Sequence, residues 1–444
     1  MRLKPYSRYK DSNLEWLTAV PSHWEINKIG RISEFGVGWT PPTGIQENFE
    51  GDNKWANISD LGPRTIYDTA KRISDDAVET SRLKVSPRGS LLFGFKLSVG
   101  DVSFAGTDMY TNEAIATFFE SKRVTLRYAY YAYPLFIIEN AGENIYGARI
   151  LNQERIRNAK IALPSIKDQL VIAEFLDRET AEIDAFIADQ ERLIELLEER
   201  RAATITHAVT KGLDPNSPMK NSGIEWLGSV PEGWAIAPLK WVSQLVTGTT
   251  PSTTVEGHFT DDVDGFPWIR PEDIDESGQP TVASKTLSST GRHLVRVLPP
   301  KTVLLVCIGA TLGKVGITAD ETSTNQQITS IYSKSIESKY LFFTMQAAYP
   351  EIRLAATGTT LPILNSSRLG SLRLPLPSEK EQQLISTYLE RETTEIDAAV
   401  GDAREAIALS RERRAALISA AVTGQLDVSQ HDRPVEARVD EVWV

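Results

Sequence analysis

The stretch Pro164-Ser-Ile-Lys-Asp-Gln169 begins a segment that decides the fold, because the whole segment occurs twice. It continues through Phe175-Leu-Asp-Arg-Glu-Thr-Ala-Glu-Ile-Asp184 and Glu199-Arg-Arg-Ala-Ala203 to Ala208-Val-Thr-Lys-Gly-Leu-Asp214. The pattern returns without a gap from Pro377-Ser-Glu-Lys-Glu-Gln382 to Ala421-Val-Thr-Gly-Gln-Leu-Asp427. A repeat this long indicates a duplicated domain with its helix, and not a solenoid unit of about 20–50 residues.

Both copies of the segment are typical of long helices. Ser165 with Asp168, and Ser378 with Glu381, have the spacing of a capping box just after a proline. The acidic residue also lies where the helix dipole favours negative charge. Several turns follow without proline or glycine, apart from Gly401. We therefore predict two long helices.

Apolar residues recur in steps of four and three along both segments, which predicts a coiled-coil seam. Its positions are Leu176, Thr180, Ile183, Ile187, Gln190, Ile194, Leu197, Arg201, Thr204 and Ala208 in the first copy. In the second copy they are Leu389, Thr393, Ile396, Val400, Ala403, Ile407, Ser410, Arg414, Leu417 and Ala421. The helix-pairing residues are predicted to be Leu176, Ile183, Ile187, Ile194, Leu197, Leu389, Ile396, Val400, Ile407 and Leu417.

Two seams of equal length in one chain most simply pair with each other, and we expect them to pack antiparallel. The alternative is that each helix covers only its own domain. A helix from Ser165 to Thr210 would be about 70 Å long, which exceeds the size of a small domain.

The remaining sequence is also duplicated. Residues 11–24 match residues 221–234, with Glu-Trp-Leu, Val-Pro and a second Trp in common, and this irregular sequence suggests a clip that packs on other surfaces. Further anchors recur, such as Gly38-Trp-Thr-Pro41 with Gly248-Thr-Thr-Pro251, and Asn112 with Asn325. Between the anchors the two copies differ freely. We therefore expect the two copies to perform the same task on different targets.

Short β-rich runs between Gly, Pro, Asn and Asp turns predict a twisted sheet with a few helices in each globular part. The predicted fold class is α+β, with two mixed α/β domains separated by two long antiparallel coiled-coil helices in an internal pseudo-twofold repeat. The predicted segments are 1–162, a first domain with its N-terminal arm; 163–213, the first helix; 214–375, the second domain; 376–425, the second helix; and 426–444, a C-terminal tail that is loosely ordered from residue 428.

Composition excludes several classes of protein. The hydrophobic fraction of 41% and the charged fraction of 24% are typical of a globular protein. A single cysteine, Cys307, rules out an intramolecular disulfide and lies in an apolar run typical of a buried strand. We expect no signal peptide, because residues 1–6 lack an apolar region, and no membrane span. A cytoplasmic location is expected.

The net charge of −11 argues superficially against a nucleic-acid partner. Much of the negative charge lies in the two helical segments and the tail, so the globular parts are nearer neutral and could present a basic face. Charge therefore neither supports nor excludes DNA binding.

No motif for covalent chemistry is found. Residues 309–315, Gly-Ala-Thr-Leu-Gly-Lys-Val, are one residue short of a phosphate loop, and Val315 replaces the Ser or Thr that would hold magnesium. We predict a strand, a turn and a strand there. The five histidines have no metal-ligand spacing. We expect no catalytic residue, no metal and no cofactor in this chain.

Together these residues resemble the specificity subunit of type I restriction–modification enzymes. The resemblance rests on Ser-x-x-Glu-Trp-Leu-x-x-Val-Pro-x-x-Trp, which occurs at 12–24 and at 222–234. It rests also on Leu-Pro-Ser-x-x-[Asp/Glu]-Gln, which occurs at 163–169 and at 376–382. It also rests on Arg-Arg-Ala-Ala with Val-Thr-x-x-Leu-Asp at each helix end, and on the Gly-x-Thr-Pro, Gly-x-Val and Asn-[Gln/Glu] anchors. No single motif is specific for this family, but the occurrence of all of them twice in the same order is.

The resemblance implies two target-recognition domains, each reading one half of a bipartite double-stranded DNA sequence, with the paired helices as a spacer. It implies two modification subunits that carry S-adenosylmethionine and methylate adenine N6, and motor–nuclease restriction subunits that use ATP and Mg²⁺. The first copy departs from the family at Asn112-Glu113, where a glutamine is usual, while Asn325-Gln326 keeps it. We therefore leave Glu113 out of the candidates below.

Candidates for DNA contact are polar residues in turns near the repeated anchors, because hydroxyls, amides and cations hold phosphates and base edges. In the first domain they are Thr40, Thr43, Asn57, Ser59, Lys96, Ser98, Asn112 and Arg149. In the second domain they are Thr250, Thr253, Arg270, Thr311, Lys314, Asn325 and Gln326. The alternative for each is a polar residue that only stabilises its turn.

Two other functions are compatible with parts of the sequence. One is a coiled-coil scaffold that binds only proteins, which the net charge of −11 slightly favours. The other is an enzyme in its own right, such as a fused methylase, which would need a motif like Asn-Pro-Pro-Tyr that this sequence lacks. The resemblance favours a non-catalytic DNA-specificity subunit.

Overall fold

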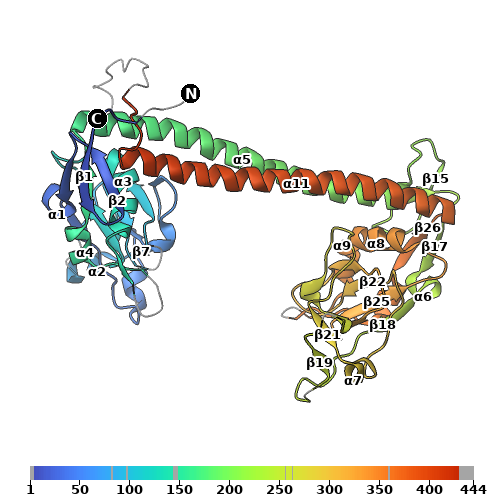
Figure 1. Cartoon of the computed structure of the whole chain (residues 1–444). Coiled ribbons are helices and arrows are strands. Elements are labelled where there is room, and N and C mark those ends of the chain that lie inside the picture. Colours follow the sequence, from blue (N-terminus) through green and yellow to red (C-terminus); the bar gives the residue numbers. More distant parts are fainter. Residues whose placement is uncertain are drawn as a thin grey trace. The chain divides into compact units, whose positions relative to one another are not determined.

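The computed structural model describes residues 5–81, 84–96, 99–143, 149–255, 257–262, 264–358 and 361–429. The chain forms two compact units, which we call the first unit, residues 1–188 with 407–444, and the second unit, residues 189–406. Each unit contains one globular domain and part of each of two long helices (Figure 1).

The long helices are α5 (Ile166–Lys211) and α11 (Glu379–Val422). The capping residues predicted from the sequence act at their N-terminal ends. The Ser165 hydroxyl donates to the Asp168 carboxylate at 2.9 Å and accepts from the Asp168 amide at 3.2 Å. At α11, the Glu381 carboxylate accepts from both the amide and the hydroxyl of Ser378, at 3.1 and 2.7 Å. These bonds satisfy helix amides that have no intrahelical partner.

The two helices pack antiparallel in each unit. In the first unit, Arg414 of α11 donates to Asp184 of α5 at 2.8 Å. In the second unit, Arg201 of α5 donates to Asp397 of α11 at 3.0 Å. In each pair an early residue of one helix meets a late residue of the other, which only an antiparallel pair allows. The two pairs are equivalent in the repeat, and they explain the arginines at two positions of the seam.

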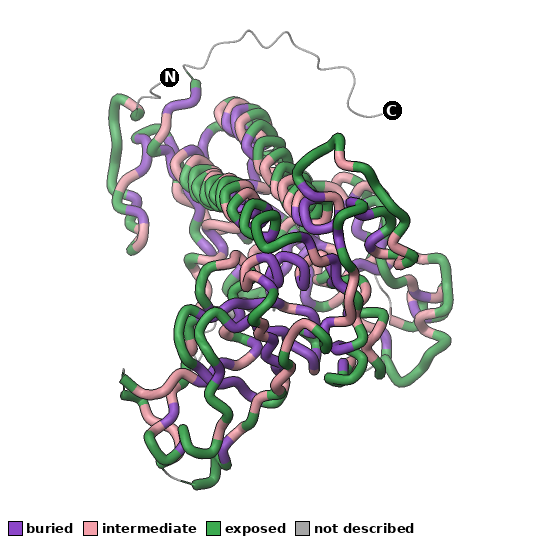
Figure 2. The backbone as a smooth tube through the Cα atoms, turned by 90° about the vertical axis from the view of Figure 1, so that its right-hand side faces the viewer, coloured by how far each residue is buried: buried purple, intermediate pink, exposed green. Residues whose placement is uncertain are grey.

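The predicted helix-pairing residues lie on the covered side of the helices. Leu176, Ile183, Leu389, Ile396, Val400 and Ile407 are buried. Ile187, Ile194, Leu197 and Leu417 are half-buried. Buried and exposed positions alternate along both helices, as the tube in Figure 2 shows. This pattern agrees with the seam expected from the heptad spacing.

The first domain contains two small mixed sheets. One has the order β4-β11-β8-β9-β6 and the other β10-β5-β7. Their strands are β4 (Phe35–Val37), β5 (Asn53–Ala56), β6 (Thr65–Ile66), β7 (Lys71–Ile73), β8 (Leu91–Gly94), β9 (Val102–Ala105), β10 (Tyr110–Thr111) and β11 (Ile115–Phe118). Two strand pairs lie outside these sheets: β3 (Glu25–Lys28) with β14 (Lys160–Leu163), and β12 (Gly142–Glu143) with β13 (Arg149–Ile150). The helices are α1 (Ile29–Ile32), α2 (Asp75–Ser81), α3 (Leu126–Ile138), α4 (Gln153–Asn158), η1 (Gln46–Phe49) and η2 (Ile58–Asp60).

The second domain repeats this plan. Its sheets have the orders β18-β25-β22-β23 and β19-β21-β20-β24. Their strands are β18 (Gln244–Thr247), β19 (Phe259–Thr260), β20 (Phe266–Ile269), β21 (Lys285–Leu287), β22 (Val303–Val306), β23 (Val315–Ile317), β24 (Ser323–Thr324) and β25 (Ile328–Tyr332). Outside these sheets, β17 (Ala235–Pro238) pairs with β26 (Arg373–Leu376). The helices are α6 (Leu239–Val242), α7 (Ser289–Arg292), α8 (Ser338–Ala347), α9 (Tyr349–Ala355), α10 (Ser366–Ser371) and η3 (Pro271–Asp273).

Residues 309–313 form the turn between β22 and β23, as the sequence predicted. Cys307, directly after β22, is buried with a free thiol. Burial raises the pKa of this thiol, which therefore stays protonated near neutral pH. Such a cysteine behaves as a small core residue.

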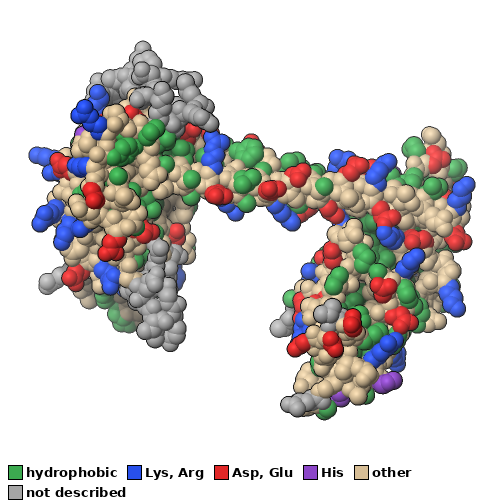
Figure 3. Space-filling model, viewed as in Figure 1, with side chains coloured by type: hydrophobic (Ala, Val, Ile, Leu, Met, Phe, Trp, Pro, Cys, Tyr) green, Lys and Arg blue, Asp and Glu red, His purple; other side chains and the backbone are tan. Residues whose placement is uncertain are grey.

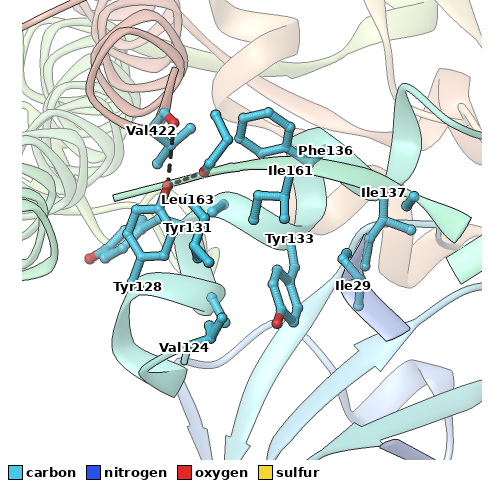
Figure 4. Close-up of a cluster of buried hydrophobic side chains, with 14 of the residues drawn as sticks. Ile29, Val124, Tyr128, Tyr131, Tyr133, Phe136, Ile137, Ile161, Leu163 and Val422 are labelled. Carbon is cyan, nitrogen blue, oxygen red and sulfur yellow. Dashed lines mark hydrogen bonds between the residues drawn. The ribbon is translucent and has the colours of Figure 1, made fainter. Parts of the chain in front are cut away.

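A buried tyrosine joins each domain to the helices. In the first unit, the Tyr128 hydroxyl of α3 donates to the Ala162 carbonyl of β14 at 3.1 Å and lies 3.4 Å from the Val422 carbonyl, at the end of α11 (Figure 4). In the second unit, the Tyr340 hydroxyl of α8 reaches the Pro375 carbonyl of β26 at 3.1 Å and the Val209 carbonyl near the end of α5 at 3.4 Å. Each domain is thus fixed to the C-terminal end of one long helix.

A buried glutamine fixes each domain to the beginning of the other long helix. Gln169 accepts from the Thr125 amide at 2.9 Å and donates to the Pro164 carbonyl at 3.1 Å. Gln382 accepts from the Glu337 amide at 2.8 Å and donates to the Pro377 carbonyl at 3.0 Å. The repeat therefore extends to single hydrogen bonds.

The segments expected to act as clips that pack on other surfaces form antiparallel hairpins, a pairing that the sequence did not predict. The hairpins are β1 (Tyr9–Leu14) with β2 (Leu17–Pro21), and β15 (Met219–Asn221) with β16 (Ser229–Pro231). Backbone pairing organises them despite their polar, proline-containing sequence. Trp24 and Trp234, which follow the hairpins, are buried in the two main cores.

The first hairpin packs where α11 ends. The Tyr9 hydroxyl donates to the Gly424 carbonyl at 3.0 Å. Val428 is also buried in the core of the first unit. The predicted tail beyond residue 429 lies outside the described residues.

Candidate nucleic-acid interface

A loop–turn motif lies where β4 and β11 of the first domain come together. It consists of residues 38–41, which follow β4, and residues 111–114, which precede β11. The Trp39 amide donates to the Thr111 carbonyl at 2.9 Å. A Cβ atom on Gly38 would lie 1.9 Å from that carbonyl oxygen, so only glycine allows the approach.

This approach places the Thr40 hydroxyl against the Glu113 carboxylate, and the hydroxyl donates a hydrogen bond to it. The turn itself is fixed by Asn112, whose side-chain oxygen accepts from the Ala114 amide at 3.1 Å. Thr40 is half-buried, whereas Glu113 is exposed. The motif therefore presents the Glu113 side chain on the surface.

The second domain builds the same motif from residues 248–251 and 324–327. A Cβ atom on Gly248 would lie 2.1 Å from the Asn325 carbonyl oxygen. The Thr250 hydroxyl donates to the side-chain oxygen of Gln326, which is exposed. Asn325 is 6% exposed, and its side-chain oxygen accepts from the Gln327 amide at 3.1 Å. Asn325 thus supports the turn, and the exposed polar group is Gln326.

A tryptophan holds the loop in both copies. The indole Nε1 of Trp55 donates to the Trp39 carbonyl at 3.1 Å. The indole Nε1 of Trp268 donates to the Thr249 carbonyl at 3.0 Å. Because both tryptophans are buried strand residues, the loops are supported by the sheets.

A cleft of about 560 Å³ lies beside the first motif, with Trp39, Lys96, Glu113 and Asn152 among its lining residues. The Thr40 hydrogen bond lowers the pKa of Glu113, and the nearby charge of Lys96 acts in the same direction. Glu113 is therefore ionised near neutral pH and can only accept hydrogen bonds.

A second group of candidates lies at the N-terminal ends of the short helices that follow β5 and β20. The Asn57 side chain accepts from the Ser59 amide at 2.9 Å and from its hydroxyl at 2.6 Å. At the equivalent place, Arg270 donates to the Ser284 hydroxyl at 2.9 Å and lies 2.6 Å from Glu272. These side chains already have intramolecular partners, as the turn-stabilising alternative requires.

The last two candidates of the second domain are in different surroundings. Thr311 and Lys314 line a cleft of about 1230 Å³, together with Arg201 of α5 and Arg404 of α11. Lys314 Nζ lies 3.9 Å from the Glu276 carboxylate. Thr250 and Gln326 are absent from this lining, so the candidates of the second domain do not form one cluster.

The remaining candidates lie in exposed loops or in parts of the chain that are not fully described. Thr43 and Thr253 are exposed in loops. Ser98 lies outside the described residues, and Arg149 belongs to β13 in a part of the chain whose side chains are not described. Glu113 is not among the predicted residues because it departs from the glutamine usual at this position, although the recurrence of Gly-x-Thr-Pro with an Asn-initiated turn marks the position.

Within the described ranges, no group of three or more His, Cys, Asp or Glu residues is arranged to hold a metal ion. None of the helices described is long and apolar enough to cross a membrane.

A model of the type I restriction modification DNA specificity domain matches residues 21–196 and again residues 231–400. The chain belongs to this family. The two matches agree with the two domains and the repeated loop–turn motif described above. The mixed α and β content, the internal repeat and the long helices are those expected from the sequence.

Among curated members, the MjaIX specificity subunit of Methanocaldococcus jannaschii is 29% identical over 173 residues, which are 37% of this chain and 38% of the relative. The HindI specificity subunit of Haemophilus influenzae is 31% identical over 157 residues, 34% of this chain and 33% of the relative. This chain thus spans about a third of the length of these two relatives. The MjaVIII specificity subunit of M. jannaschii is 22% identical over 401 residues, 86% and 89% of the two chains.

Solved structures share the fold. A chain from a structure of complex assembly and conformational transition in the type I R-M system has a TM-score of 0.71 at 15% identity, and covers 92% of this chain and 99% of that one. The HsdS subunit of Thermoanaerobacter tengcongensis has a TM-score of 0.51 at 15% identity, and covers 92% and 98%.

Proposed function

We propose that this chain is the specificity subunit of a type I restriction–modification complex. Each globular domain reads one half of a bipartite double-stranded DNA target, and the helix pair sets the distance between the halves. The observation that carries this proposal is the loop–turn motif. It is built by the same hydrogen bonds in both domains, yet it presents Glu113 in one and Gln326 in the other. A shared scaffold with a different exposed group suits the reading of two different half-sites.

The globular domains are better placed than the helices to bind DNA. Acidic and basic side chains are interspersed along the helix pair on the face that Figure 3 shows, without a continuous basic patch. Phosphate binding needs clustered cations, hydroxyls or amides. Turn residues such as Thr43 and Lys96 are exposed on the first domain and can supply such contacts.

The proposed partners are two modification subunits, which would carry S-adenosylmethionine and methylate adenine N6, and motor–nuclease restriction subunits, which would use ATP and Mg²⁺. The chain itself would contribute no catalytic group and no cofactor site. Transfer of labelled methyl groups to DNA by this chain alone, free of partner subunits, would contradict this division of roles.

The test is to purify the full chain with the modification subunits of its host and to map methylated sites in genomic DNA. The expected result is one bipartite sequence with two defined halves and a gap of fixed length. Stable assembly without any sequence preference would contradict the proposal and favour a coiled-coil scaffold that binds only proteins.

A further inference from the structure

The two loop–turn motifs differ in the hydrogen-bonding character of the group that they expose. In both, the threonine hydroxyl donates its single proton to a side-chain oxygen, which is Oε2 of Glu113 or Oε1 of Gln326. The oxygen that remains on Glu113 can only accept a hydrogen bond. On Gln326 the amide nitrogen takes no part in the threonine bond, and this nitrogen can only donate.

The structures that hold Glu113 and Gln326 in place are alike in the two domains. An Asn side chain fixes each turn with a bond of 3.1 Å to the amide two residues later. A buried tryptophan holds each loop by its carbonyl, at 3.1 Å in the first domain and 3.0 Å in the second. The exposed group is therefore held on a sheet-supported loop, which a base-reading side chain requires for its orientation.

The negative charge of Glu113 favours contact with a DNA base over contact with a phosphate. A carboxylate is repelled by phosphate oxygens, so Glu113 is unsuited to hold the DNA backbone. Lys96 lines the same cleft and offsets the negative charge near the site. In the major groove, only cytosine N4 and adenine N6 offer amino hydrogens to an acceptor, whereas guanine O6 and N7 and thymine O4 accept.

We propose that Glu113 reads an exocyclic amino group, of cytosine or adenine, at one position of the first half-site, and that Gln326 donates to a base acceptor at the equivalent position of the second. Thr40 and Thr250 act as positioning residues, because they fix which atom faces the DNA. This inference rests on the proposed function and names the residues that distinguish the two half-sites.

The test uses the full chain in complex with modification subunits, and selection of bound duplexes from a random DNA library. Glu113→Gln keeps an oxygen for the Thr40 bond, as in the second domain, so we expect it to fold. Its preference for C or A at one position of the first half-site should fall about tenfold, with the second half-site unchanged. Thr40→Val should weaken the preference at the same position. Gln326→Glu should change one position of the second half-site only.

The matched control is Glu154→Gln, which removes an equal charge from an exposed residue lining the same cleft. It should change the salt dependence of binding without changing any base preference. The inference is overturned if Glu113→Gln leaves both half-sites as in the wild type, or alters binding to all sequences equally. If the wild-type complex itself selects no bipartite sequence, the proposed function fails instead.

Discussion

At the residue scale, a glycine and a threonine in each domain build the loop–turn motif. Gly38 and Gly248 let two backbone segments touch, and this contact brings Thr40 onto Glu113 and Thr250 onto Gln326. Thr40 and Glu113 are 73 positions apart. The sequence indicated the repeated Gly-x-Thr-Pro and Asn anchors, but the bond between them depends on how the two strand ends meet.

We predict that Gly38→Ala destabilises the first unit by about 1–3 kcal/mol, because the added methyl group collides with backbone that cannot move aside. Urea unfolding followed by tryptophan fluorescence would measure the loss. Gly44→Ala is the control, since a Cβ there meets nothing within 4 Å. Equal stability of the Gly38 and Gly44 variants would show that the close approach is not required.

At the element scale, long helices with capping boxes and a heptad seam follow from local sequence, and α5 and α11 agree with them. The role of the seam arginines could not be predicted, because the partners Asp184 and Asp397 lie on the opposite helix. The hairpins were missed for a similar reason. Their order comes from pairing and from burial of Trp24 and Trp234 in the cores, not from an alternating pattern.

The Asp184–Arg414 pair should specify the register of the helices. Reversing one charge, as in Asp184→Arg, places two cations together, and we expect a loss of roughly 1 kcal/mol, measured by thermal unfolding at low salt. Combining it with Arg414→Asp should recover most of the loss. If the double reversal were as unstable as the sum of the two single reversals, the pair would not couple the helices.

Asp177 of α5 is a further contact between the first domain and the long helices. It accepts from Tyr131 and Arg127, both at 2.7 Å, and from Arg64. Burial raises the pKa of Asp177, but these hydrogen bonds outweigh it and hold the pKa below the usual aspartate value. The charged form therefore stabilises the fold above about pH 4, and this contribution is lost as the pH falls through the depressed pKa.

We expect Asp177→Asn to lower the stability of the first unit by roughly 2 kcal/mol at pH 7, and the difference from wild type to shrink steadily below pH 4. Melting temperatures across this pH range provide the measurement. Glu174→Gln, at an exposed position of the same helix, is the control and should have little effect at any pH. If Asp177→Asn were less stable than wild type by the same amount at pH 7 and at pH 3, the charge of Asp177 would not be involved.

At the scale of the whole molecule, the duplication organises both structure and proposed function. Each domain is fixed to the end of one long helix by a buried tyrosine, Tyr128 or Tyr340, and to the beginning of the other by a buried glutamine. The sequence predicted the order of domain and helix. It could not show which helix end each domain contacts, because those bonds join residues such as Tyr128 and Val422 that are far apart in the chain.

The central claim is that the globular domains determine the half-sites and the helices determine their spacing. The most direct test inserts one heptad after Gln190 and another after Ala403, which preserves the seam and lengthens each helix by about 10 Å. Methylated sites would then be mapped for this variant in complex with its modification subunits. We predict two unchanged half-sites separated by a gap about 3 base pairs longer, at about 3.4 Å per base pair. Altered half-sites with an unchanged gap would contradict the claim.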